Sequence, residues 1–171
     1  DAFGLAAGAV LDGDNGAASY AVGQIDVLDF AGWTGTIDGA QIVNQEQVLL
    51  SGAADVTFGG SGLSNANLTD GLSVQAGSSA IARFSSNFAL NGSFVNLGIL
   101  DLSSRHGAAG TALSVGGNYA GGGRFVIDVD FASDLSDQLL VSGSVTGTTY
   151  VVVNDVSGGA ASGNNVAFVT V

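Results

Sequence analysis

Apolar residues of this chain recur at one fixed offset in the sequence. The same offset relates Ile42, Leu68 and Phe94; Val48, Val74 and Leu100; and Phe58 and Phe84. Gly- or Ser-rich turns separate these positions, and self-similarity of this kind is typical of a solenoid. Each period would form one coil of about three short strands, and strands of equal phase would stack into parallel sheets. We expect the three sets of residues to form apolar ladders inside the coil.

The repeat is built from short apolar runs of strand-like length. No window of about 11 residues shows the 3.6-residue periodicity of a helix, and Gly, Asn, Asp and Ser clusters separate the runs. The runs are Ile25–Leu28, Gln47–Leu50, Asp55–Phe58, Leu72–Gln75, Ala80–Phe84, Ile99–Leu102, Arg124–Phe131, Gln138–Val141 and Tyr150–Val153. These features predict an all-β chain, folded as a right-handed parallel β-helix.

The composition narrows the class of protein. Of 171 residues 46% are hydrophobic, which is too apolar for a disordered chain despite the net charge of -12. Of the 15 acidic residues only Glu46 is Glu, and Asp favours turns and strand ends. The basic residues are Arg83, Arg105 and Arg124, so a nucleic-acid backbone would be repelled and we expect no nucleic-acid partner. Cys is absent, so no disulfide holds the fold.

The longest apolar stretches, such as Gln47–Leu50 and Tyr150–Val153, are far shorter than the roughly 20 residues of a membrane helix, so we expect no direct bilayer span. Asp1 is preceded by neither a starting Met nor a leader, which favours a mature or excised piece.

The last third of the chain differs from the rest. After Leu102 the offset is expected to fail, and Ser103–Gly110 to form a loop or insertion. We therefore expect two domains, β-helix coils over 1–115 and a β-rich C-terminal cap over 116–171, because an open solenoid end needs covering. In the cap the chain would turn to antiparallel pairing, with turns at Ser142-Gly143, Thr146-Gly147 and Asp155–Gly163.

Four motifs in this last third follow one another in order. They are Gly117-Asn118-Tyr119, Gly123-Arg124-Phe125-Val126-Ile127-Asp128-Val129, Ser136-Asp137-Gln138-Leu139-Leu140-Val141-Ser142-Gly143, and Thr146-Gly147-Thr148-Thr149-Tyr150-Val151-Val152-Val153-Asn154. This segment resembles the C-terminal autochaperone region of pertactin-like autotransporter passengers. The resemblance continues into the family's final strand at Asn165–Val171, and Phe30–Ile37 is similar to passenger repeat sequence.

The resemblance implies a β-helical stalk at the cell surface, or secreted, outside a Gram-negative outer membrane. It also implies a non-catalytic C-terminal segment that promotes β-helix folding and displays a surface for adhesion or host interaction, without a cofactor. The implied partners are a host or cell-surface receptor or another passenger, and a translocator β-barrel in the full-length chain. We expect the folding cap to depend on Tyr119, Phe125, Ile127, Leu139, Val141, Val151 and Val153.

A few residues bear on catalytic alternatives. His106 is the only His, and no nucleophile elbow accompanies it, so we interpret it as a loop residue. Asp128 and Asp130 would lie roughly 7 Å apart on one strand face, near Asp134 and Asp137, which leaves open a carbohydrate-active β-helix such as a lyase or tailspike fragment. We interpret these acids as solvent-facing residues of a cap strand and turn, because no aromatic platform for stacking a sugar accompanies them, and Trp33, the only Trp, is far away in sequence.

Two segments begin like calcium loops. Asp12–Gly16 lacks the acidic residue that a 12-residue loop needs at its end, and Ser64 replaces the ligating Asp in Gly59–Ser64. We therefore expect no dedicated metal ligands, while an acidic surface-layer module remains a third alternative. Asn91-Gly92-Ser93 is interpreted as a turn.

Overall fold

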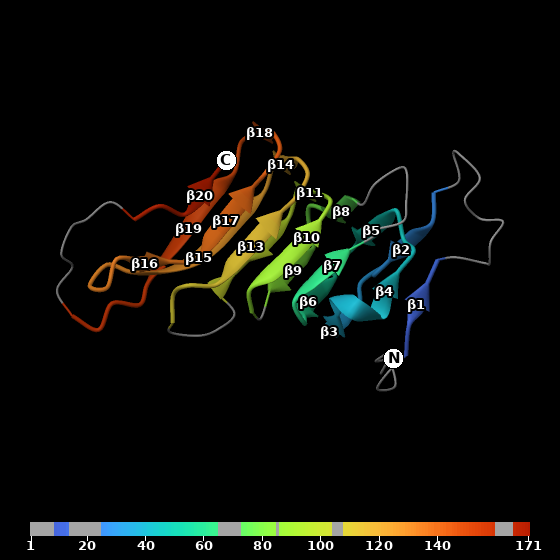
Figure 1. Ribbon diagram of the computed structural model, residues 1–171, viewed down its shortest axis with the longest axis horizontal. Coiled ribbons are helices and arrows are strands. Elements are labelled where there is room, and N and C mark those ends of the chain that lie inside the picture. Colours follow the sequence, from blue (N-terminus) through green and yellow to red (C-terminus); the bar gives the residue numbers. More distant parts are fainter. Residues whose placement is uncertain (1–8, 14–24, 65–72, 85, 104–107, 160–165) are drawn as a thin grey trace.

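The computed structural model describes residues 9–13, 25–64, 73–84, 86–103, 108–159 and 166–171. The chain winds as a parallel β-helix, and successive coils follow one another along the long axis in the colour order of Figure 1. Each complete coil contributes one strand to each of three sheets. This confirms the predicted all-β class and the stacking of coils.

Sheet 1 contains six parallel strands. In chain order they are β2 (Val27–Asp29), β5 (Gln47–Leu50), β8 (Ser73–Ala76), β11 (Ser93–Asn96), β14 (Tyr119–Gly121) and β18 (Val145–Gly147).

Sheet 2 carries the longest strands. Its parallel strands are β3 (Thr34–Asp38), β6 (Asp55–Gly59), β9 (Ile81–Phe84), β12 (Ile99–Asp101), β15 (Arg124–Asp130) and β19 (Tyr150–Asp155). The short strand β16 (Leu135–Ser136) pairs antiparallel with the end of β15.

Sheet 3 contains β7 (Gly62–Ser64), β10 (Phe88–Asn91), β13 (Ala112–Val115), β17 (Gln138–Val141) and β20 (Val169–Thr170). At the N-terminal end, β1 (Leu11–Asp12) pairs with β4 (Ile42–Val43). The one-turn helix η1 (Gly39–Gln41) precedes β4, and the Asp38 carboxylate caps it by accepting the N–H of Ala40 at 2.9 Å. We call β14, β15 and β17 the penultimate coil, and β18, β19 and β20 the final coil.

The predicted ladders are confirmed in two of their steps. Val48 pairs with Val74, and Phe58 with Phe84, each across the offset seen in the sequence. The step from Val74 to Leu100 is wrong, because Val74 pairs next with Phe94 in sheet 1, whereas Leu100 lies in sheet 2 beside Ala82. The ladder of Ile42, Leu68 and Phe94 is wrong as well, because Ile42 pairs with Leu11 on β1, whereas Phe94 lies in sheet 1 beside Val74. Leu68 lies outside the described residues.

The sequence spacing between paired residues is uneven, which explains the misplaced step. Within the three sheets this spacing is shortest between β9 and β12, where Ala82 pairs with Leu100, and longest between β17 and β20, where Leu139 pairs with Val169. A corner can lose or gain residues without disturbing strand register, since only the strands carry the ladder hydrogen bonds. A fixed offset therefore describes part of the stack only.

The offset also resumes beyond Leu102, contrary to expectation. Phe125 pairs with Val151 at the same offset as Phe58 with Phe84, and the strands of the final coil pair parallel with those of the penultimate coil. Antiparallel pairing in this segment is confined, among the described strands, to β15 with β16. The segment expected to form an antiparallel cap instead continues the parallel coils, because its apolar residues keep the inward phase of the preceding coils.

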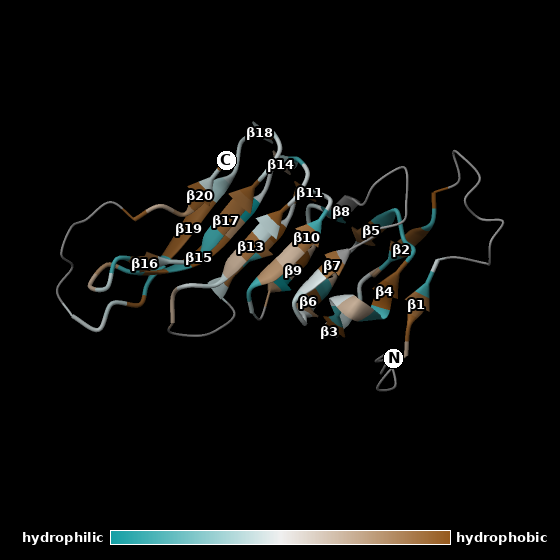
Figure 2. Ribbon diagram, viewed as in Figure 1, coloured by the Kyte–Doolittle hydropathy of each residue, from teal (hydrophilic) through white to brown (hydrophobic). Residues whose placement is uncertain are grey.

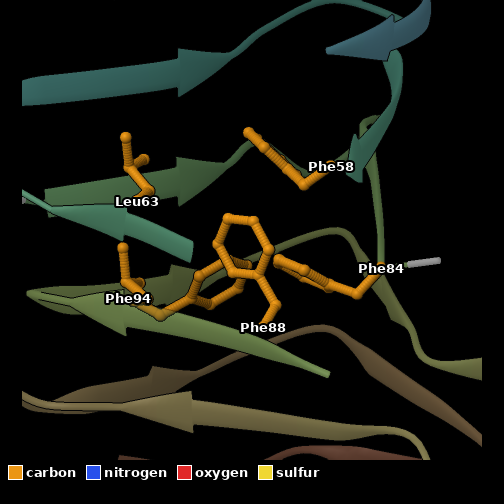
Figure 3. A pocket seen from close by; sticks show the side chains of 6 residues that line it. Phe58, Leu63, Phe84, Phe88 and Phe94 are labelled. Carbon is orange, nitrogen blue, oxygen red and sulfur yellow. The ribbon is translucent and has the colours of Figure 1, made fainter. Parts of the chain in front are cut away.

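Aromatic rings fill the middle of the stack. The rings of Phe58 and Phe84 are stacked with centroids 5.4 Å apart, and Phe88 lies 5.0 Å from Phe84. Figure 3 shows these rings facing one another with Phe94 and Leu63 beside them, and the space between them leaves no room for a water molecule. The interior is therefore a packed core and offers no ligand cavity here.

Close backbone approach explains a glycine at one corner. The N–H of Arg124 donates to the carbonyl oxygen of Gly98 at 2.8 Å, which brings Gly123 against Gly98. A Cβ atom on Gly123 would overlap the Gly98 carbonyl oxygen. The corner between β14 and β15 thus requires glycine at this position.

Candidate functional site in the last two coils

The seven residues expected to form the folding cap fall into two groups. Five of them are 5% exposed or less and face the interior from the penultimate coil: Tyr119, Phe125, Ile127, Leu139 and Val141. Val151 and Val153 lie one rung further on and are 38% and 45% exposed. The difference arises because no described strand covers the outer edge of the final coil.

Tyr119 connects three successive coils through its hydroxyl group. The side-chain amide of Asn96, at the end of β11, donates to the Tyr119 hydroxyl oxygen at 3.2 Å, and the hydroxyl of Thr149, just before β19, lies 3.2 Å away. Asn96 also donates to the carbonyl oxygen of Arg124 at 2.8 Å. Its amide is fully buried, so these bonds hold the corners of adjacent coils together.

Asp137 ties the penultimate coil together from its buried position before β17. Its carboxylate accepts backbone N–H bonds from Gly110 at 3.0 Å, Thr111 at 2.8 Å and Asp128 at 2.8 Å. Its own N–H donates to the carbonyl oxygen of Asp128 at 2.9 Å. One side chain therefore fixes β15, the start of β17 and the segment leading into β13.

Burial dominates the protonation of this group. Desolvation raises the pKa of Asp137 above its ordinary value, and the neighbouring Asp128 adds to the rise, while the three backbone N–H bonds oppose it. Asp128 is itself 2% exposed, and its Oδ1 atom accepts from the side-chain amide of Asn154 at 3.1 Å. Asp128 Oδ2 and the Thr111 hydroxyl are buried without a hydrogen-bond partner.

The acids singled out from the sequence are mostly engaged with the backbone. The interpretation of Asp128 and Asp137 as solvent-facing is wrong, because both are buried by neighbouring strands. Asp130 is half-buried and accepts from the N–H groups of Ala132 and Ser133 at the turn after β15. These bonds, with the Ser133 hydroxyl first, lower the pKa of Asp130. Asp134 is exposed in the same turn, with a φ of 54°.

Other residues considered as functional are dispersed. His106 lies outside the described residues, whereas the nearby Ser103 hydroxyl donates to Asp101 at 2.6 Å. Trp33 packs on Phe30 with ring centroids 5.2 Å apart. Asp12 accepts from the Asn44 amide at 2.8 Å, and within the described ranges no three His, Cys, Asp or Glu residues gather as a metal site would require.

An ion-pair ladder crosses the outer face of sheet 2, and sequence reasoning missed it. Arg83 on β9 binds Asp55 on β6 through two nitrogens, at 2.7 and 3.1 Å, and its third nitrogen contacts Asp101 on β12. The hydrogen bond to Asp55 raises the pKa of Arg83 above its ordinary value. The recurrence of opposite charges from coil to coil would have indicated the ladder, but only after the coil spacing was known.

The part of the chain described here contains no helix with the length and apolar character needed to cross a bilayer.

Comparison with known proteins gives a consistent family. The probable autotransporter YfaL of Escherichia coli K12 is 35% identical over 123 residues, which cover 70% of this chain and 9% of that protein. The uncharacterized protein YuaQ of the same strain is 40% identical over 73 residues, covering 41% of this chain and 5% of that protein.

The matched segments thus cover less than a tenth of either relative, and no solved structure matches the chain significantly. A family model described as pertactin matches residues 85–171, about half of the chain, and this range includes the penultimate coil and the final coil. The matched range contains Tyr119, which contacts Thr149 just before β19, and Asp137, which binds backbone within the penultimate coil and just before β13. The chain belongs to the pertactin family of autotransporter passengers, which lie at the cell surface or are secreted outside the Gram-negative outer membrane.

Proposed function

We propose that this segment is a non-catalytic stalk whose last two coils promote folding of the β-helix and which displays a surface for adhesion or host interaction. The observation that carries the folding role is the concentration of cross-coil polar ties in the penultimate coil. Asp137 there binds backbone N–H groups of its own coil and of the coil before it, and the Tyr119 hydroxyl contacts side chains of the coils on either side. The same coil contains β15, the longest strand in the described part of the chain.

The physical basis for such a role is the difficulty of starting a solenoid. An isolated coil buries little surface, and each later coil adds onto an edge that already exists. A coil fixed by internal hydrogen bonds supplies such an edge at lower entropic cost than an unconstrained one. The penultimate coil, with its buried Asp137 and Tyr119, is suited to form early.

The non-catalytic part of the proposal rests on the use of the acids. Asp128 bonds to Asn154, Asp130 caps a turn, and Asp137 accepts three backbone N–H groups. A glycoside-cleaving pair would need two carboxyl groups facing a substrate cleft. The buried position of Asp128 does not suit that arrangement, so the carbohydrate-active alternative is not favoured.

In the full-length protein the family implies a translocator β-barrel as a partner of this stalk. A host or cell-surface receptor, or another passenger, would bind the displayed surface. These partners are part of the proposal, and the folding role is the part that the chain itself can test.

The test compares two buried isoleucines on the same sheet at opposite ends of the stack. Ile127→Val acts on β15, where Ile127 is 0% exposed, and Ile37→Val acts on β3, where Ile37 is 1% exposed. Each change should destabilise the chain by about 0.5–1.5 kcal/mol. Stopped-flow refolding and unfolding of each full-chain variant would show how that loss divides between the two rates.

If the last coils fold first, Ile127→Val slows refolding with little effect on unfolding, and Ile37→Val mainly accelerates unfolding. The reverse division of the two effects, or equal division in both variants, would reject the folding role. Both variants carry the same Ile-to-Val substitution at a buried position of the same sheet. The comparison therefore isolates the position of the residue in the stack.

A further inference from the structure

The outer face of sheet 2 changes character along the stack. Its outward residues on β3 and β6 are polar: Thr34, Thr36, Asp38, Asp55 and Thr57. From β9 onward one row of this face runs from Ile81 to Ile99, then to Arg124 and to Tyr150, each paired with the next. Figure 2 shows β19, which carries Tyr150, among the hydrophobic strands. A single cation in this row therefore lies between aliphatic and aromatic side chains.

Two exposed side chains border the cation. Leu97, just before β12, is 44% exposed, and a Cβ atom on Gly122 would come within 2.9 Å of its Cδ2 atom. Leu97 therefore lies over the glycine corner that leads into Arg124. Tyr150 is 69% exposed, and its outward direction follows from its pairing with Arg124, whichever residues come after β19. We use the name Arg124 patch for Ile81, Leu97, Ile99, Arg124 and Tyr150.

The charge of Arg124 is available to a ligand. Its side chain is exposed, and among the described residues no carboxylate forms an ion pair with it. Asp101 and Asp128 on the same face are already engaged, with Arg83 and Asn154 respectively. In a chain with a net charge of -12 most of the surface repels an anion, so an uncommitted cation marks a place where an anionic group can bind.

The residue types of the Arg124 patch favour a polypeptide over a sugar. Arg and Tyr are enriched among the residues that dominate the binding free energy of protein interfaces, and exposed apolar side chains that lie together mark interaction sites. The guanidinium group matches a carboxylate through two parallel hydrogen bonds. A sugar would need further hydrogen-bond partners, whereas besides Arg124 and the Tyr150 hydroxyl the side chains of the patch are hydrocarbon.

We propose that the Arg124 patch docks a protein partner whose Asp or Glu carboxylate is flanked by apolar side chains. The carboxylate binds the guanidinium group of Arg124, while neighbouring side chains of the partner pack on Leu97, Ile99 and Tyr150. This inference rests on the proposed display of a surface for adhesion or host interaction. It is independent of the folding role, which concerns the interior of the same coils.

A pair of peptides that differ by one charge tests this chemistry. The probes are acetyl-Leu-Glu-Phe-amide and acetyl-Leu-Gln-Phe-amide, each titrated into the isotope-labelled chain and followed by NMR chemical shifts. The Glu peptide should shift the guanidinium signal of Arg124 and the backbone amide signals of Ile99 and Tyr150. The Gln peptide should bind about tenfold more weakly, because it cannot form the charge-assisted hydrogen bonds.

Variants of the chain test the position of the site. Arg124→Gln should weaken binding of the Glu peptide about tenfold, and Leu97→Ala should also weaken it, because it removes apolar contact area. Leu135→Ala is the matched control, since Leu135 on β16 is 51% exposed and lies outside the Arg124 patch, and it should leave binding unchanged. Circular dichroism of each variant confirms that the fold is retained.

Several results would overturn the proposal. Equal binding of the two peptides rejects the role of the carboxylate. Shifts confined to another face, or unchanged binding by Arg124→Gln, remove the docking site from this patch. Absence of binding rejects the docking proposal, whereas the folding role is decided separately by the refolding rates of Ile127→Val and Ile37→Val. Glucuronate that binds the patch as tightly as the Glu peptide would assign it to an acidic sugar instead of a protein partner.

Discussion

The side-chain amide of Asn96 donates a hydrogen bond of 3.2 Å to the hydroxyl oxygen of Tyr119 in the interior of the stack. Asn96 is fully buried and Tyr119 is 2% exposed, so water does not compete for this bond. Because Thr149 lies 3.2 Å from the same hydroxyl, one oxygen atom connects the corners of three coils. This buried network adds side-chain hydrogen bonds at the corners to the backbone ladders that already join the coils.

Replacing Tyr119 with Phe should destabilise the chain by about 1 kcal/mol, because it removes the hydroxyl that accepts from the buried Asn96 amide, which then keeps only its bond to the carbonyl oxygen of Arg124. The ring still stacks on Phe94 at 6.2 Å, so the packing is preserved. Urea denaturation measures the change. Tyr150→Phe is the control, since Tyr150 is 69% exposed, and its effect should be close to zero. Equal losses in the two variants would contradict the role of the network.

The raised pKa of Asp137 predicts a distinctive dependence of stability on pH. A carboxyl group whose pKa is higher in the folded protein keeps its proton longer in that state. Its contribution to stability is complete below the ordinary value of 3.8 and is lost as the pH rises through the folded pKa. Asp137→Asn removes this titration but leaves one buried N–H group facing an amide, at a cost of about 1–3 kcal/mol.

We therefore expect the unfolding free energy of Asp137→Asn to fall below that of the unmodified chain at acidic pH, and the gap to narrow as the pH rises above 3.8. Urea titrations across a pH series give this difference directly. A gap that widens with pH would mean that the three backbone N–H bonds outweigh desolvation.

The ion-pair ladder on sheet 2 predicts that arginine and lysine are not equivalent at residue 83. Arg83→Lys keeps the charge but loses the two-nitrogen contact with Asp55, and should destabilise the chain by about 0.5–1 kcal/mol at low salt. Added salt should reduce the difference, because it screens partly exposed pairs. Arg124→Lys, at an exposed position for which the described residues supply no ion pair, should be neutral at any salt concentration.

Much of the fold follows from local patterns in the sequence. Every apolar run identified as a strand overlaps a strand of sheet 1, 2 or 3, since short runs bounded by turn residues are specific for β structure. The step from Val48 to Val74 follows from the offset because the coil between them has the length of one period. The step to Leu100 fails because the next coil shortens its corners, and corner length leaves no periodic signal.

The arrangement of the cap was harder to predict. Longer, better alternating strands such as β15 are equally compatible with antiparallel hairpins and with another parallel coil. The parallel solution is favoured because Phe125 and Val151 have the inward phase of the rungs below them. Similarly, alternation placed Asp128 on the outer face correctly, but it gave no sign of the hydrogen bond from Asn154, which belongs to the next coil.

The central claim is that the coils stack to the end of the chain with their apolar rows facing inward. Leu139→Asp and Val141→Asp test it most directly, because they place an unpaired charge at buried positions that are 2% and 5% exposed. Leu140→Asp is the matched control, on the same strand at a half-buried position of the opposite face. Thermal unfolding followed by circular dichroism should show no cooperative transition in the first two variants and a retained transition in Leu140→Asp. A cooperative transition unchanged in Leu139→Asp and Val141→Asp would contradict the account.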